Sequence, residues 1–564
     1  MSQMMALAAR LRNTLALSAV AIAGALLISA CGSGSSDALP GPGPDVPPAD
    51  SLIRVSGQSP FTPNCGGAQA GTLYFNAEVE PYLAVNPGSS ANLIAVWQQD
   101  RWSNGGSQGH VTGISFDGGL TWASRTPPLS RCAGGNAANG GDYERATDPW
   151  VTFSPNGVAY QMSLSFSGES FQPGSANAML VSRSTDGGRT WANPATLIRD
   201  GGGFFNDKNS ITADPNDARF VYAVWDRLTA GGGGPAYLAR SVDGGSTWEG
   251  ARPIYDPGVR SQTIGNQIVV LPNGTLVDLF TQIDEGANGT TSAFLSVIRS
   301  ADNGATWSSP SRIAGLTALG ARDPETGTEI RDGSTIGQIA ADQVGKLYVV
   351  WQDARFSGGQ RDGIALSRST DGGATWSAPL RINGDPGVQA FTPSVTVRSD
   401  GMIGVSYYDL RSNTADPVTL PADYWLARSR DAITWSESRA GGPFNLAIAP
   451  NAGGLFLGDY QALASVGALF IPLFVQTGDI TNRSDVVARL VAVNGSSAAK
   501  HSATWETVLA QEAKLPMHIA ASASALPMTL KFRQRVHENI VNNMERRVPG
   551  WGEIRLRSHA PPDA

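Results

Sequence analysis

An eight-residue motif that recurs along the chain constrains the fold more than any other feature of the sequence. Its pattern is Ser-x-Asp-Gly/Asn-Gly-x-Thr-Trp, and residues 369–376 form a complete copy. Further copies occupy residues 115–122, 184–191, 241–248 and 300–307, and a shorter copy that lacks the glycines occupies residues 429–435. Because the copies recur at comparable places in a longer unit, the sequence predicts a repeat architecture.

The composition of the motif predicts a tight turn between two strands. Its Asp can accept hydrogen bonds from backbone N–H groups of the same turn, and its second Gly can adopt the positive φ that a tight connection needs. The Trp is expected to fill the space below the turn. A motif that is present in every repeat cannot mark one active site, so we interpret it as structural.

Each unit that carries the motif reads as four strands, with the motif between the third and the fourth. A last unit lacks the motif, and residues 458–464, 468–475 and 485–490 are its predicted first three strands. Residues 51–56 are similar to the fourth strands that follow the motif elsewhere, such as residues 379–383. We therefore expect the N-terminal strand to complete the last unit and so to remove an open sheet edge.

The motifs resemble the Asp-box, or BNR, repeat of sialidases and related β-propellers, over about residues 51–495. The resemblance implies an all-β fold, and the units counted above predict a seven-bladed β-propeller closed by an N-terminal strand. Six blades, as in sialidases themselves, is the alternative. Residues 496–564 form a different C-terminal tail, in which residues 530–547 are a predicted helix that Pro549 and Gly550 would end.

Composition restricts the classes of function. Charged residues make up 16% of the chain, with 66 Gly and 14 Trp, which is typical of a turn-rich and strand-rich protein. The net charge of -7 argues against nucleic acid as a partner. Four of the five His residues lie in the C-terminal tail without a metal-binding spacing. We expect no metal, no cofactor and a monomeric chain.

The N-terminus is a predicted export signal. Arg10 and Arg12 precede an apolar run over residues 15–28, which is short for a membrane span and suits a signal peptide. Residues 28–31 resemble a bacterial lipobox, so residues 1–31 would be a lipoprotein signal peptide with Cys31 as the lipidated residue; an ordinary signal peptide is the alternative. Gly32 favours, by the same resemblance, the outer membrane of the cell envelope. The lipid anchor is then the only expected contact with the membrane.

Two further features follow from export. Residues 32–50 are rich in Gly, Ser, Pro and Asp and read as a flexible linker. Cys65 and Cys132 are the two cysteines left in the exported chain, and such a pair is expected to form a disulfide.

The face opposite the motif turns is the predicted functional face. Starts of first strands and ends of second strands meet there. First strands begin near Glu78, Glu80, Arg145, Asp148, Asp207, Lys208, Asp332 and Asp459. Second strands end in a recurring aromatic–Asp–Arg pattern whose arginines are Arg101, Arg227, Arg355 and Arg411, with Trp97 and Trp351 among the aromatic residues. Arginine binds carboxylates through two parallel hydrogen bonds, so these residues predict binding of an acidic glycan or glycoprotein.

The sialidase resemblance implies a Tyr nucleophile with acidic partners. Tyr408 and Tyr460 are the candidate nucleophiles, and Asp148, Asp332 and Asp459 are the candidate acidic groups. The sequence lacks the Arg-Ile-Pro motif that opens sialidase domains, so the first arginine of that family's triad has no counterpart here. Two interpretations stay open: a sialidase-like exo-glycosidase, and a non-catalytic propeller that binds glycans or proteins. The repeated Asp–Arg pairs can equally be salt bridges between blades.

Overall fold

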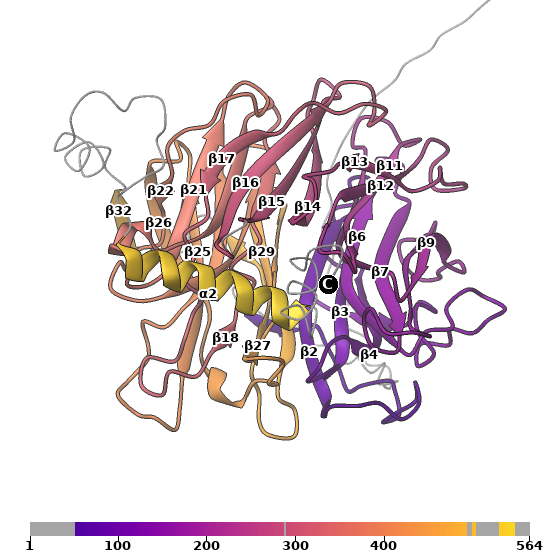
Figure 1. The fold of residues 1–564 in the computed structure, drawn as a ribbon, viewed down its shortest axis with the longest axis horizontal. Coiled ribbons are helices and arrows are strands. Elements are labelled where there is room, and N and C mark those ends of the chain that lie inside the picture. Colours follow the sequence, from indigo (N-terminus) through magenta and orange to yellow (C-terminus); the bar gives the residue numbers. More distant parts are fainter. Residues whose placement is uncertain (1–50, 287–288, 493–498, 503–528, 548–564) are drawn as a thin grey trace, which may run out of the picture. The chain divides into compact units, whose positions relative to one another are not determined.

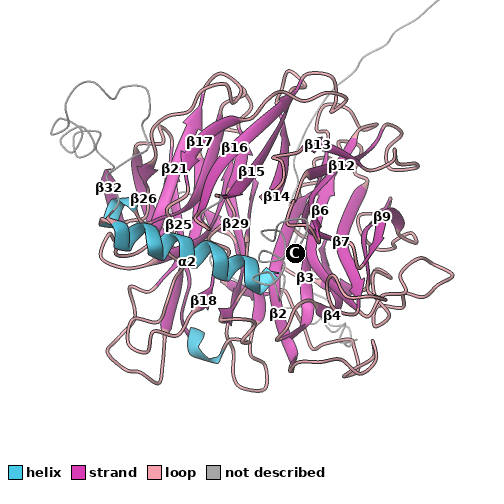
Figure 2. Ribbon diagram, in the orientation of Figure 1, coloured by secondary structure: helices cyan, strands magenta, loops and turns pink. Residues whose placement is uncertain are grey.

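The computed structural model describes residues 51–286, 289–492, 499–502 and 529–547. The predicted signal peptide, Cys31 and the linker over residues 32–50 lie outside these residues. The described part of the chain is built from β-strands, with one α-helix, α2 (Leu530–Arg547), and two short 3-10 turns, η1 (Arg355–Ser357) and η2 (Leu446–Ile448) (Figure 1, Figure 2). No helix in these ranges has the length and apolar character needed to cross a membrane.

The same antiparallel order of four strands recurs along the chain. The first three groups are β2 (Leu73–Val85), β3 (Leu93–Trp102), β4 (Ser107–Ser115) and β5 (Ala123–Arg125); β6 (Arg145–Phe153), β7 (Ala159–Ser167), β8 (Ala176–Ser184) and β9 (Ala195–Gly201); and β10 (Phe204–Ala213), β11 (Val221–Thr229), β12 (Ala236–Ser241) and β13 (Arg252–Tyr255). A single pair of residues, Ser107 and Ala146, joins the first group to the second.

Three more groups follow. They are β14 (Ser261–Val270), β15 (Leu276–Glu285), β16 (Thr291–Ser300) and β17 (Ser311–Gly315); β19 (Gln338–Ala341), β20 (Leu347–Asp353), β21 (Gly363–Ser369) and β22 (Leu380–Arg381); and β23 (Ala390–Val397), β24 (Ile403–Asp409), β25 (Pro421–Ser429) and β26 (Thr434–Asn445), to which β32 (Ala499–Ser502) adds. Two short strands, β18 (Ile330–Arg331) and β27 (Leu455–Phe456), form a separate parallel pair.

The last sheet joins the two ends of the strand-rich region. Its strands are β28 (Ala462–Val466), β29 (Leu469–Gln476), β30 (Asp485–Arg489) and the N-terminal β1 (Leu52–Arg54), and β31 (Val491–Ala492) also pairs with β29. The register pairs Leu52 with Arg489 and Arg54 with Val487. The predicted pairing of the N-terminal strand with the last unit is therefore present, and the free edge of β30 is covered.

First strands of successive groups lie next to each other. β2 contacts β6, β6 contacts β10, and the sequence of contacts continues through β14, β19 and β23 to β28, which also contacts β2. A residue with positive φ recurs in or just before these strands: Glu80, Asp148, Lys208, Gly265, Gly333, Thr392 and Gly458. Positive φ is unusual for residues other than Gly and is held only where surrounding contacts demand it. The first strands thus bend at one level, and charged side chains occupy three of these bends.

The motif turns have the predicted local geometry. At residues 369–376 the Asp371 carboxylate accepts hydrogen bonds from the backbone N–H groups of Ala374 and Thr375 and from the Thr375 hydroxyl, at 3.1, 2.9 and 2.5 Å. Gly372 and Gly373 have φ values of 68° and 86°. The Ser369 hydroxyl donates to Asp371 at 2.8 Å and accepts from the backbone of Gly373. Each turn is therefore stabilised by its own residues.

Alternating side chains of the strands fill the space between neighbouring sheets. The largest apolar cluster runs from Trp150 through Trp225 to Trp351 and includes Val536 and Ile540 of α2. The helix prediction for residues 530–547 is confirmed, and its buried residues recur at intervals of four, as expected for a helix that lies on a protein surface. Helix α2 is therefore packed on the core of the strand-rich region.

Candidate functional site

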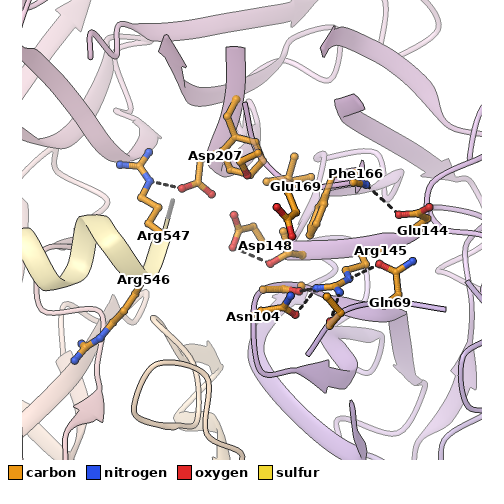
Figure 3. A pocket seen from close by; sticks show the side chains of 18 of the residues that line it. Gln69, Asn104, Glu144, Arg145, Asp148, Phe166, Glu169, Asp207, Arg546 and Arg547 are labelled. Atoms are coloured by element: carbon orange, nitrogen blue, oxygen red, sulfur yellow. Dashed lines mark hydrogen bonds and ion pairs between the residues drawn. The ribbon is translucent and has the colours of Figure 1, made fainter. Parts of the chain in front are cut away.

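A pocket of about 520 Å³ lies where several strands begin, away from the motif turns. Its walls come from residues 68–70 ahead of β2, residues 104–106 between β3 and β4, residues 168–172 between β7 and β8, and the starts of β6 and β10. The motif turns connect third strands to fourth strands at the other ends of the same sheets. The pocket therefore lies on the face that the sequence predicts to be functional. Figure 3 shows several of the side chains that line it.

A network of buried charges lies beside the pocket. The Lys208 ammonium is within 2.6 Å of Asp459, 3.1 Å of Asp148 and 3.3 Å of Glu80. Arg331 binds Asp459 through two nitrogens, at 3.1 and 2.8 Å. These charges come from β2, β6, β10, β18 and the segment before β28, so only the tertiary fold brings them together.

The network shifts the pKa values of its three carboxyl groups in opposite directions. Burial alone would raise the pKa of Asp459, but Arg331 and Lys208 hold that pKa well below its usual range. Burial also opposes ionisation of Asp148, yet Lys208 keeps the pKa of this carboxyl below its ordinary value. Burial raises the pKa of Glu80 to about 7, and Lys208 offsets only part of that effect. One carboxyl that protonates near neutral pH thus shares a lysine with two that stay ionised.

Two arginines line the pocket without a carboxylate partner among the described residues. Arg101, 2% exposed, donates to the Gln98 side-chain oxygen at 2.7 Å and stacks on Phe456, and its Nε has no hydrogen-bond partner. Arg145 donates to neutral oxygens only, those of Gln69, Asn104 and the Ala70 and Gly105 carbonyls. Burial lowers the pKa of each guanidinium to about 10, which leaves both charged at neutral pH.

The other arginines predicted to bind substrate do not line this pocket. Arg227 is paired with Asp200 of β9 at 2.7 Å and stacks on Phe204. Arg355 and Arg411 pair with the aspartates two residues before them, Asp353 and Asp409, at 2.7 and 2.6 Å. Three of the four arginines of the recurring pattern are thus neutralised near the strand ends, Arg355 and Arg411 by their own loops and Arg227 by a neighbouring sheet.

The predicted aromatic residues are part of the core. Trp97 and Trp351 are fully buried, and their indole N–H groups donate to Gln99 and Asp353. Tyr408 is fully buried among aromatic rings, and its hydroxyl donates to the Val475 carbonyl at 2.7 Å. No sugar could reach these rings, because large apolar side chains at regular positions serve the packing between sheets.

Tyr460 and Asp332 are also held by other groups. The Tyr460 hydroxyl donates to the Pro149 carbonyl at 3.0 Å, and burial raises its pKa well above the usual range, so this phenol is not prepared to act as a nucleophile. Asp332 accepts from the Ala321 backbone at 2.6 Å and from Gln352 at 2.8 Å, in a separate buried group with Asp362. Asp148 and Arg101 are the predicted residues that do line the pocket, while Asp459 lies beside it in the charge network.

The sequence did not single out several residues of the site. Lys208, Glu80 and Arg145 belong to the charged starts of first strands, but no local signal separates them from their neighbours. Arg331 lies in the short β18, and Arg546 and Arg547 end α2; all three line the pocket. Nothing in their local sequence places them at the centre. Among the described residues, no cluster of three or more His, Cys, Asp or Glu side chains is arranged to bind a metal ion.

The disulfide shapes one side of the pocket. Cys65 is bonded to Cys132, 67 residues further along the chain, so the predicted pairing is present. The bond ties the segment before β2 to the long loop before β6. Residues 68–70, which line the pocket, follow directly from Cys65.

Comparisons with known proteins gave no family match and only distant similarities. No known protein-family profile matches the chain. A xyloglucanase of Paenibacillus sp is 28% identical over 222 residues, which are 36% of this chain, and the chain spans 18% of that relative's length. Solved structures that are similar to this chain include a Hadza microbial sialidase (17% identity, TM-score 0.40, covering 72% of this chain and 75% of that one). An α-L-arabinofuranosidase of Fusarium graminearum (12% identity, TM-score 0.41, 64% and 92%) is also similar, as is a sialidase of Streptococcus pneumoniae (13% identity, TM-score 0.39, 78% and 71%).

Proposed function

We propose that the protein is a seven-bladed Asp-box β-propeller that binds an acidic glycan in the pocket lined by Arg101 and Arg145. The observation that carries the proposal is the state of these two guanidinium groups, which are buried, charged and without a carboxylate partner among the described residues. A buried guanidinium without a counterion attracts an anion, and Arg101 also has an Nε donor without a partner. Sugar carboxylates have the geometry that such donors match.

The pocket also has features that suit a sugar ring. Its volume of about 520 Å³ is within the range of small-molecule sites. Phe166 and Phe205 provide apolar surface, and Asn104, Glu144 and Glu169 provide polar groups for sugar hydroxyls. A uronic acid or sialic acid residue would place its carboxylate toward Arg101 and its ring toward the phenylalanines.

Hydrolysis of the glycan is the second candidate function. The observation that favours it is the pair of opposite shifts at Glu80, whose pKa rises to about 7, and Asp148, whose pKa is depressed. Opposite shifts of this kind distinguish the general acid from the ionised carboxylate in many glycosidases. A carboxylate-based route would replace the Tyr-based one, because neither Tyr408 nor Tyr460 has a free hydroxyl.

Calorimetric titration of the purified protein tests the binding proposal. We expect binding of sialyllactose or of a short oligogalacturonate, and none of neutral lactose. Arg101→Gln and Arg145→Gln should each weaken binding by about 10- to 100-fold, the usual loss for one charge-assisted contact. Arg227→Gln is the matched control, since its guanidinium is already paired with Asp200. Equal binding of neutral and acidic glycans would contradict the proposal, and turnover of a fluorogenic sialoside or uronide would show which candidate function holds.

We also propose that the protein is anchored in the cell envelope through lipid on Cys31, with residues 32–50 as the tether. The apolar run and the lipobox-like residues 28–31 support this proposal. Mass spectrometry of membrane fractions should find a diacylglyceryl group on an N-terminal peptide that begins at Cys31. A fully soluble protein cleaved at another residue would exclude it.

A further inference from the structure

Helix α2 packs on the surface of the strand-rich region, and its last turn lies beside the central charge network. Phe532 lies against Gly359, while Val536, Ile540 and Met544 join the main apolar cluster. Asn539 donates to the Ala318 carbonyl at 3.1 Å and to the Ser334 hydroxyl at 3.0 Å. The helix therefore has one continuous docked face, and Figure 1 shows it lying across the strand-rich region. Its last two residues, Arg546 and Arg547, line the pocket.

The last residue of the helix neutralises two carboxylates of the propeller. Arg547, whose side chain is 3% exposed, forms ion pairs with Asp207 of β10 and Asp226 of β11, and it donates to Gln262 of β14 at 3.1 Å. Asp207 and Asp226 are themselves buried, and Arg547 is the only cation within ion-pair distance of either among the described residues. Figure 3 shows Arg547 extending from the end of α2 toward Asp207.

The same helix turn forms part of the pocket wall. Arg546 and Arg547 line the pocket together with Asp148, Asp207 and Lys208. A small second cavity lies under the helix end, between Arg547, Asn543 and the Lys208–Asp459 pair. Without α2, the pocket would extend toward this cavity, and Asp207 and Asp226 would lose the ion pairs that Arg547 provides.

We propose that Asp207, Asp226 and Gln262 form a subsite for a guanidinium group, which Arg547 fills from within the chain, and that α2 is a displaceable cover over this end of the glycan pocket. The two carboxylates and the amide oxygen of Gln262 can only accept hydrogen bonds from a bound cation. A guanidinium has five donors in one plane, and this arrangement matches the three acceptor groups better than the donors of an ammonium group do. The cover is held by one apolar strip, by the hydrogen bonds of Asn539, and by the ion pairs of Arg546 with Glu329 and of Arg547 with Asp207 and Asp226. Displacement of the helix would widen the pocket and expose an acidic subsite beside the cationic one. The statement about glycan access rests on the proposed function, whereas the guanidinium subsite does not.

The subsite can be tested in the full-length protein with Arg547→Ala. Hydrogen exchange of the amides in residues 530–547 should become at least about tenfold faster, because the helix opens locally when its strongest polar contact is lost. Added N-methylguanidinium should raise the melting temperature of this variant and leave that of the wild-type protein unchanged. Methylammonium at the same concentration should raise it less. Arg535→Ala is the matched control on the same helix, because Arg535 donates only to the Gly359 carbonyl.

The subsite would be overturned if hydrogen exchange in Arg547→Ala were as slow as in the wild-type protein. It would also be overturned if N-methylguanidinium and methylammonium raised the melting temperature of the variant equally. If Arg547→Ala does not fold, Arg547→Lys keeps the charge without the planar fork, and its exchange should then be intermediate. A hydrogen-exchange rate in Arg547→Lys equal to that of the wild-type protein would also contradict the proposal. These readouts need no glycan, so they remain valid if the proposed function fails.

The covering role can be tested by locking the helix in place. A Cβ placed on Gly453 would lie 3.7 Å from the Arg546 Cβ, within the usual spacing of about 3.5–4.5 Å for a disulfide. The double variant Gly453→Cys, Arg546→Cys should bind the acidic glycan more weakly when oxidised than when reduced. Equal binding in both states would show that α2 does not cover the ligand site. Absence of binding in wild-type protein as well would instead refute the proposed function.

Discussion

At the motif turns, an aspartate carboxylate is stabilised by residues two to four positions away in the chain, whereas at the centre Asp459 depends on Lys208 and Arg331, which are 251 and 128 positions away. Asp371 lies near the solvent and its hydrogen bonds depress its pKa to about 2. Asp459 is buried, and only the cations opposite it outweigh the cost of burial. Aspartate thus serves two purposes in this protein: it closes a turn through local hydrogen bonds, and it joins distant segments at the charge network.

Removal of the central lysine should have the largest effect. Lys208→Met leaves Glu80, Asp148 and Asp459 without the cation that they share, and breaking a buried pair in this way costs about 3–5 kcal/mol. Chemical denaturation should show this loss in the free energy of unfolding. Lys346→Met, at an exposed turn, is the control and should change stability little. An unchanged midpoint for Lys208→Met would mean that the comparison between the two regions is mistaken.

Removal of a turn carboxylate should have a smaller and local effect. Asp371→Ala deletes the acceptor for three donors in the turn and should lower the free energy of unfolding by about 1–2 kcal/mol. Because the turns are far apart and share no partner, Asp186→Ala and Asp371→Ala should be additive within about 0.5 kcal/mol. Lys208→Met and Asp459→Asn should instead be strongly non-additive. Loss of glycan binding with an unchanged melting temperature in Asp371→Ala would show that the turns are not purely structural.

The two regions should respond to pH in opposite directions. The pKa of Asp371 is depressed to about 2, so its contribution is complete above the unfolded pKa of about 3.9 and is lost as pH falls through 2. The pKa of Glu80 is raised to about 7, so its contribution to stability decreases as pH rises from about 4.5 to 7. Unfolding at pH 5 and pH 8 should show a weaker pH dependence for Glu80→Gln than for wild type. The same dependence in both proteins would exclude Glu80 as its source.

Local chemistry made much of the fold predictable. The turn motif, the strand pattern, the pairing of residues 51–56 with the last sheet, the Cys65–Cys132 bond and the helix over residues 530–547 all follow from signals within short segments or from compartment chemistry. The face on which the pocket lies was also predictable, since strand order alone decides which strand ends lie opposite the turns. The site residues were harder to predict from the sequence, because Arg227, Arg355 and Arg411 share their sequence pattern with Arg101 but not its surroundings.

By itself, the sequence determined where the strands turn, because each turn is closed by its own Asp, Ser, Thr and Gly residues through contacts only a few positions long. Only the tertiary structure decided which charged residues meet at the pocket. In the part of the chain that the structure describes, Arg101 and Arg145 have no carboxylate within ion-pair distance, while Lys208, Arg331 and Arg547 are matched with acids contributed by other sheets. The physical reason is that the energy of a buried charge depends on every neighbour within a few ångströms, and those neighbours come from segments that are hundreds of residues apart.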